Sequence, residues 1–203
     1  MRLDQAIADL RIVRDFIPVT NSNRPRTRLR PAHITIHNTG NPKPGADAAA
    51  HARYMKGEDA QARQVSWHFT VDDHATIQSL PTSEIGWHAG PGNASSLGIE
   101  ICMHEGMDAA PAYQRAAQLV AALARKHGIG VPGGIKQHHD WTGKNCPSVL
   151  RGTPDGWNRF LAQVTVAFQA IAHPPEKVTG RKAARNRTSK QYASRTNAEK
   201  KKR

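Results

Sequence analysis

The sequence predicts a single α/β domain in which a β-sheet is flanked by helices. Short apolar runs typical of strands recur between longer segments whose apolar residues follow helical spacing, which is the order expected of a sheet with helices on its faces. The chain has 203 residues with 38% hydrophobic content, enough for one substantial core. All four tryptophans lie between Trp67 and Trp157, which places the folded body there.

The first half of the chain predicts two helices and three strands. Residues from Leu3 to Phe16 carry apolar side chains at helical spacing and predict the first helix. Residues 33–37 follow a basic, proline-bearing loop and read as a buried strand. The alanine-rich run from Asp47 to Lys56 predicts the second helix, and residues 65–71 and 76–80 predict a pair of strands.

The second half predicts one strand between a loop and two long helices. Residues 90–96 are expected to form the loop, and residues 98–103 the strand. Pro111 is expected to open a helix that ends at His127. The last helix should run from residue 155 or 156 to about Ala172, before a pair of prolines. The order of the strands does not follow from these patterns.

Two segments a hundred residues apart carry the ligand types of a zinc site. His37 ends the strand of residues 33–37, and residues 138–147 contain a His-His pair followed by Cys146. A catalytic zinc takes three protein ligands, commonly imidazole and thiolate, and leaves a fourth position for water. With eleven histidines in the chain, ligand type alone is weak evidence. The positions of these residues strengthen the evidence, because functional sites are commonly built at strand ends and in loops that contain Gly or Pro.

Six stretches of the chain occur together in one order and spacing. They are Ile17-Pro18-Val19 with Asn23-Arg24-Pro25, residues 34–39, residues 65–73, Trp87-His88-Ala89-Gly90, residues 99–102 and residues 138–147. From about Ile17 to Phe168 the chain thereby resembles the zinc-dependent N-acetylmuramoyl-L-alanine amidases of the type-2 family, particularly the catalytic domains of Bacillus-type phage and prophage endolysins. The resemblance implies a mixed central sheet with the zinc site at one edge.

The resemblance also implies a role for individual residues. His37, His138 and Cys146 align with the zinc ligands, and the family spacing selects His138 over His139. Glu100 aligns with the catalytic glutamate, which takes a proton from water and returns it to the leaving amine. Lys144 aligns with a lysine that stabilises the tetrahedral intermediate.

Three further residues are expected on the substrate side of the zinc site: Trp87, His88 and Asn38. The implied reaction is hydrolysis of the amide bond between N-acetylmuramic acid and L-alanine of the stem peptide in bacterial peptidoglycan. This reaction would make the protein an endolysin-like, bacteriolytic enzyme.

Three other functions compete with this interpretation. Cytoplasmic amidases that recycle anhydro-muropeptides share the broad family but typically carry aspartate where Cys146 stands. Noncatalytic peptidoglycan-recognition proteins usually lose the thiolate ligand. Specific nucleic-acid binding is disfavoured, because most of the net charge of +13 lies outside the body of the chain and no recognition motif occurs.

The C-terminal segment, residues 174–203, differs in composition from the rest. It holds eleven Lys or Arg against two Glu, so it carries +9 of the total +13. With few large apolar side chains it is predicted to be a disordered tail after a catalytic domain of residues 1–173. Its charge is consistent with nonspecific contact with anionic wall polymers or lipids, or with nonspecific nucleic-acid binding. The alternative is a solubilising tail or a remnant of a wall-binding module.

The remaining features bear on location and assembly. The first residues lack a signal-peptide pattern, because Asp4 and Asp9 interrupt the apolar positions. We therefore expect synthesis in the bacterial cytoplasm and action on the wall after release. We also expect a monomer. Of the two cysteines, Cys146 is assigned to zinc and Cys102 to the core, so no disulfide is expected.

Overall fold

A six-stranded mixed sheet forms the centre of the protein, whose residues 1–172 are described by a computed structural model. The strands are β1 (Val13–Arg14), β2 (His33–Asn38), β3 (Phe69–Val71), β4 (Thr76–Gln78), β5 (Ser96–Ile101) and β6 (Ile135–Gln137). Their order across the sheet is β1-β4-β3-β5-β2-β6. Only β3 and β4 pair antiparallel, and every other pair is parallel. The predicted mixed sheet is confirmed.

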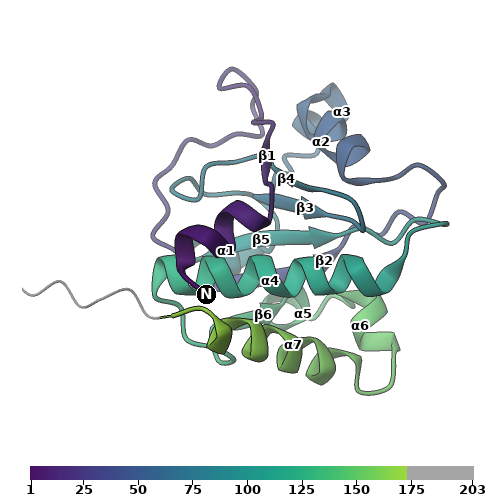
Figure 1. Cartoon of the computed structure of the whole chain (residues 1–203). Coiled ribbons are helices and arrows are strands. Elements are labelled where there is room, and N and C mark those ends of the chain that lie inside the picture. Colours follow the sequence, from purple (N-terminus) through teal and green to yellow (C-terminus); the bar gives the residue numbers. More distant parts are fainter. Residues whose placement is uncertain (173–203) are drawn as a thin grey trace, which may run out of the picture.

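Helices cover this sheet in layers (Figure 1). They are α1 (Leu3–Asp9), α2 (Ala48–Lys56), α3 (Glu58–Ala62), α4 (Ala109–His127), α5 (His138–Thr142), α6 (Ser148–Gly152), α7 (Gly156–Ala170) and the 3-10 helix η1 (Gly90–Ala94). Helix α4 runs across one face of the sheet with α1 and α7 beside it, while α2 packs against β3 and β4. The described residues form one domain.

Alternation along the strands sorts side chains between the two faces. In β2, Ile34 and Ile36 are fully buried in the main core, which α4 closes with its alanine- and leucine-rich side. Thr35 and His37 therefore point to the opposite face. The same alternation in β5 sends Ile99 to the core and its neighbour Glu100 to the other side. The polar positions of the sheet thus gather on the face that α4 does not cover.

The first helix is shorter than its periodicity predicts. It ends at Asp9, and Arg11 has a positive φ of 46° that turns the chain. Val13 and Arg14 then pair with β4 as an edge strand, and the next backbone amides continue the pairing, Asp15 N–H to Gln78 and Ile17 N–H to Ser79. The prediction of a helix as far as Phe16 is wrong, because pairing along the open side of β4 satisfies the backbone there.

Other elements match the predictions at their centres and differ at their ends. Strand β2 extends one residue further than expected, and β5 begins at Ser96 instead of residue 98. Residues 65–68 lie outside β3, and residues 90–94 of the expected loop form η1. Helix α4 begins after Asp108, whose side chain accepts from the N–H of Ala110, and ends at Gly128 with φ of 69°. The predictions of α2, α4 and α7 are confirmed.

No helix within residues 1–172 combines the length and hydropathy needed to cross a membrane. The predicted tail of residues 174–203, and its boundary at residue 173, lie outside the described residues.

Candidate metal centre and active site

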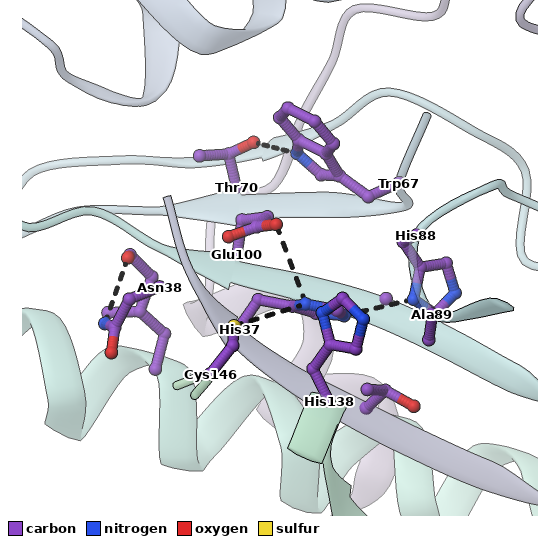
Figure 2. A network of polar contacts seen from close by, with 12 residues as sticks. His37, Asn38, Trp67, Thr70, His88, Ala89, Glu100, His138 and Cys146 are labelled. Carbon is purple, nitrogen blue, oxygen red and sulfur yellow. Dashed lines mark hydrogen bonds and ion pairs between the residues drawn. The ribbon is translucent and has the colours of Figure 1, made fainter. Parts of the chain in front are cut away.

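A row of residues from neighbouring strands crosses the face of the sheet that α4 does not cover. The strand register places His37 of β2 beside Glu100 of β5, and Glu100 beside Thr70 of β3. Because their Cα atoms are paired, the three side chains share one face. His37 and Glu100 face each other (Figure 2), with 3.8 Å between His37 Nδ1 and Glu100 Oε1. His37 is only 1% exposed. The strand pairing alone thus brings the predicted first ligand to the predicted catalytic carboxylate.

The other two ligands arrive with the turn that follows β6. Helix α5 starts at His138, directly after β6, and ends at Gly143 in the left-handed conformation with φ of 75°. The chain then returns, and the N–H of His139 donates to the carbonyl of Cys146 at 3.0 Å. Cys146 Sγ comes to lie 3.6 Å from His37 Nδ1. Figure 2 shows His37, His138 and Cys146 converging on one point.

These three residues fit a zinc ion. One potential ligand atom from each lies within 4.8 Å of the others, and the set of two imidazoles and one thiolate is what zinc prefers. The Nδ1 atom of His138 is buried and has no hydrogen-bond partner in the described part of the chain. A buried nitrogen without a partner is costly, and a metal would satisfy it. His139, the neighbour that the resemblance passed over, is not part of this group.

Burial lowers the pKa of the two imidazoles and raises the pKa of the thiol. The pKa of His37 lies well below its ordinary value, first because of burial and then because of the neighbouring His88, His138 and Lys144. Burial also lowers the pKa of His138. Both rings are therefore neutral near pH 7, the form that binds metal. Burial raises the pKa of Cys146 to about 11, so a bound cation has to displace its proton.

Glu100 has the properties of a general base. Burial raises its pKa to about 8, while the charge of Lys144 acts in the opposite direction. Its Oε2 atom is buried and has no hydrogen-bond partner among the described residues. A divalent cation beside it would lower the pKa again, toward the working range of an acid–base catalyst at neutral pH.

A cavity of about 720 Å³ opens over this cluster and is lined by Glu100, Lys144 and the three candidate ligands. Trp87, His88 and Asn38, predicted on the substrate side, also line it. The side chain of Asn38, however, forms hydrogen bonds within the protein. Its amide nitrogen donates to the carbonyl of Ile101 and the hydroxyl of Tyr113, and its oxygen accepts from the N–H of Val149.

The far wall of the cavity was not found from the sequence. It is formed by α2 and the segment after α3, with Tyr54 stacked on Trp67 at a centroid distance of 6.3 Å and with His51 and Arg63 nearby. Tyr54 and His51 belong to a helix whose spacing explains them equally well as packing residues. Only Trp67, within a stretch shared with the amidases, carried a signal.

Comparison with known proteins gives the family of the chain. Residues 27–149 match the family described as N-acetylmuramoyl-L-alanine amidase. The chain belongs to this family. It is 46% identical over 157 residues to N-acetylmuramoyl-L-alanine amidase XlyA of Bacillus subtilis (strain 168), a match that covers 75% of the chain and 50% of XlyA. It is 44% identical over 155 residues to the amidase CwlH of the same organism, covering 74% of the chain and 59% of CwlH.

Solved structures extend the agreement to the fold of this amidase-family chain. The structure of the catalytic domain of XlyA matches with a TM-score of 0.70 and 45% identity, and covers 75% of the chain and 98% of that domain. The structure of PlyL matches with a TM-score of 0.67 and 28% identity. The chain spans about half the length of XlyA, and its shared part corresponds to the catalytic domain.

Proposed function

We propose that this amidase-family chain hydrolyses the amide bond between N-acetylmuramic acid and L-alanine in bacterial peptidoglycan, with Zn²⁺ held by His37, His138 and Cys146. The observation that carries the proposal is the three-ligand cluster beside a buried carboxylate, at the base of an open cavity. Family membership supplies the substrate class, since the relatives XlyA and CwlH are named for this activity.

The chain's own residues account for the proton transfers and for charge stabilisation. When bound, Zn²⁺ acidifies a water molecule and polarises the amide carbonyl. Glu100, with its raised pKa and unpaired Oε2, takes the proton of the attacking water and returns it to the departing amine. Lys144 lies on the cavity wall, and its positive charge lowers the pKa of Glu100, His37 and His138. The same charge would stabilise the developing oxyanion.

The substrate side of the proposal rests on the cavity. Trp87 and the Tyr54–Trp67 pair provide apolar walls suited to sugar rings or to the stem peptide. Asn38 acts by tying β2 to β5, α4 and α6, since its amide nitrogen donates to Ile101 and Tyr113 and its oxygen accepts from Val149. Action on the cell wall, contact of the basic tail with anionic polymers and a monomeric state complete the proposal.

The test is digestion of purified peptidoglycan with and without chelator, followed by mass analysis of the products. Stem peptides that begin at L-alanine, lost on chelation and restored by zinc, are the expected products. Intact lactyl-peptide bonds would refute the proposed activity. Cleavage of small anhydro-muropeptides alone, with intact wall untouched, would favour a recycling amidase instead.

A further inference from the structure

The ring of His37 presents its two nitrogens to different neighbours. Its Nδ1 lies 3.6 Å from Sγ of Cys146 and so faces the ligand cluster. Its Nε2 faces the ring of His88 (Figure 2) and lies 3.1 Å from Nδ1 of that ring. The two rings meet edge to face, with centroids 5.2 Å apart and planes at 83°. This contact is a hydrogen bond between two ring nitrogens, so one ring must donate and the other accept.

The second nitrogen of His88 decides which ring donates. His88 Nε2 lies 3.3 Å from the backbone carbonyl oxygen of Ser96, which can only accept. His88 Nε2 therefore carries the hydrogen, and in a neutral ring this leaves a lone pair on Nδ1. His37 must then donate through Nε2–H, which leaves the lone pair of its own Nδ1 facing the cluster. The opposite assignment would place a hydrogen on His37 Nδ1 and block it as a ligand.

The surroundings of His88 hold its ring in this orientation. The side-chain oxygen of Asn93, in η1, accepts from the backbone N–H groups of His88 and Ala89 at 2.9 and 2.7 Å. The ring itself lies against Gly98 of β5, where an added Cβ would come within 2.7 Å of the ring. Such a contact is too close for any side chain, so glycine at this position makes room for the imidazole.

We propose that His88 is a positioning residue, which fixes the tautomer and orientation of His37 so that Zn²⁺ is bound through His37 Nδ1. This inference rests on the zinc site proposed above. Metal-binding histidines usually donate their second N–H to a carboxylate or carbonyl, and loss of that partner typically weakens metal binding by about 10- to 100-fold. In this chain a second histidine takes that place and passes the hydrogen bond on to Ser96. His88, which also lines the cavity, would thus act on the metal ligand.

The first test compares two substitutions of His88 by zinc affinity, measured by competition of the metal-free protein with a chromophoric chelator. His88→Phe keeps a ring against Gly98 but removes the acceptor, and should weaken zinc binding by about 10- to 100-fold. His88→Asn places an amide oxygen near the position of Nδ1 and should recover most of the loss. His33→Phe is the matched control. His33 lies on the same strand as His37, contacts Ser95 and Trp141, and is not one of the three candidate ligands, so its loss should leave zinc affinity unchanged.

The second test reads the tautomer directly and does not depend on any His88 variant folding. Long-range nitrogen–proton correlation spectra of the metal-free protein, labelled with nitrogen-15 in histidine, report which ring nitrogen carries hydrogen, with His37 assigned by its loss in His37→Gln. The expected result is hydrogen on Nε2 of His37 in the wild type and a tautomer mixture in His88→Phe. Hydrogen on Nδ1 of wild-type His37, or wild-type zinc affinity in His88→Phe, would overturn the inference. A wild-type protein that binds no zinc would instead refute the proposed zinc site, and the spectra would still decide the role of His88.

Discussion

Replacing Glu100 by glutamine should stabilise the metal-free protein at alkaline pH and have little effect at acid pH. Burial raises the pKa of Glu100 from the ordinary value of 4.5 to about 8 in the folded protein, because a buried carboxylate loses its hydration. In the unfolded chain the group ionises at its ordinary pKa. Its contribution to stability is therefore complete below about pH 4.5 and is lost as the pH rises to about 8.

The size of this effect follows from the two pKa values. One pKa unit corresponds to about 1.4 kcal/mol. The raised pKa of Glu100 therefore lowers the free energy of unfolding by about 1 kcal/mol at pH 5 and by about 4 kcal/mol at pH 8, relative to a residue that does not titrate. The titratable groups around it are His37, Lys144, Cys102 and Cys146, and they are present in both proteins, so their titration largely cancels in the comparison. The advantage of Glu100→Gln over wild type should grow by about 3 kcal/mol between these two pH values.

The assay is urea denaturation followed by tryptophan fluorescence, in the presence of chelator, at about pH 5 and about pH 8. Glu105→Gln, which changes an exposed carboxylate a few residues along the chain, is the matched control and should differ from wild type by less than about 0.5 kcal/mol at either pH. A difference between Glu100→Gln and wild type that stays constant with pH would refute the reasoning. Adding zinc should shrink the pH dependence, because a cation next to Glu100 lowers its pKa.

Four further outcomes are expected. Cys146→Ser should lose most bound zinc and most activity, because a hydroxyl is a far poorer ligand than a thiolate; full activity together with an absence of zinc by metal analysis would exclude the assigned site. Glu100→Ala should keep its zinc while hydrolysis slows by about 100-fold or more, and wild-type turnover in a dye-release assay on cell walls would exclude Glu100 as the base. Asn38→Ala should lower the free energy of unfolding by about 1 to 3 kcal/mol, since it removes the hydrogen-bond partner of the N–H of Val149 and of the hydroxyl of Tyr113; an unchanged denaturation midpoint would contradict this. Removing residues 174–203, which carry +9, should spare cleavage of small soluble muropeptides and weaken action on whole walls in a salt-dependent way, whereas equal loss on both substrates would assign the segment another role.

Much of the fold could be predicted because long periodic segments carry their own information. Helices α4 and α7 show apolar residues at helical spacing over many turns, and β2 alternates isoleucines with polar residues. Short elements such as β6, α5 and α6 have three to five residues each, too few for a period to be recognised. The end of α1 differs from the prediction for another reason, since Val13 fits a helix locally and forms a strand only because β4 offers it a partner.

The candidate site divides in the same way. The sequence by itself determined which candidate ligand and acid–base types are available, because His37, Glu100, His138 and Cys146 stand in motifs that resemble those of the amidases. The tertiary structure alone decided how they meet, since the register of β2 on β5 brings His37 to Glu100, and the return of the chain after α5 brings Cys146 to His37. It also brings the two ring nitrogens of His88 to partners on different strands, His37 on β2 and Ser96 on β5. The physical reason is that a sequence pattern records the properties of each residue along one element, whereas hydrogen bonds, burial and pKa shifts depend on neighbours that folding supplies from elsewhere in the chain.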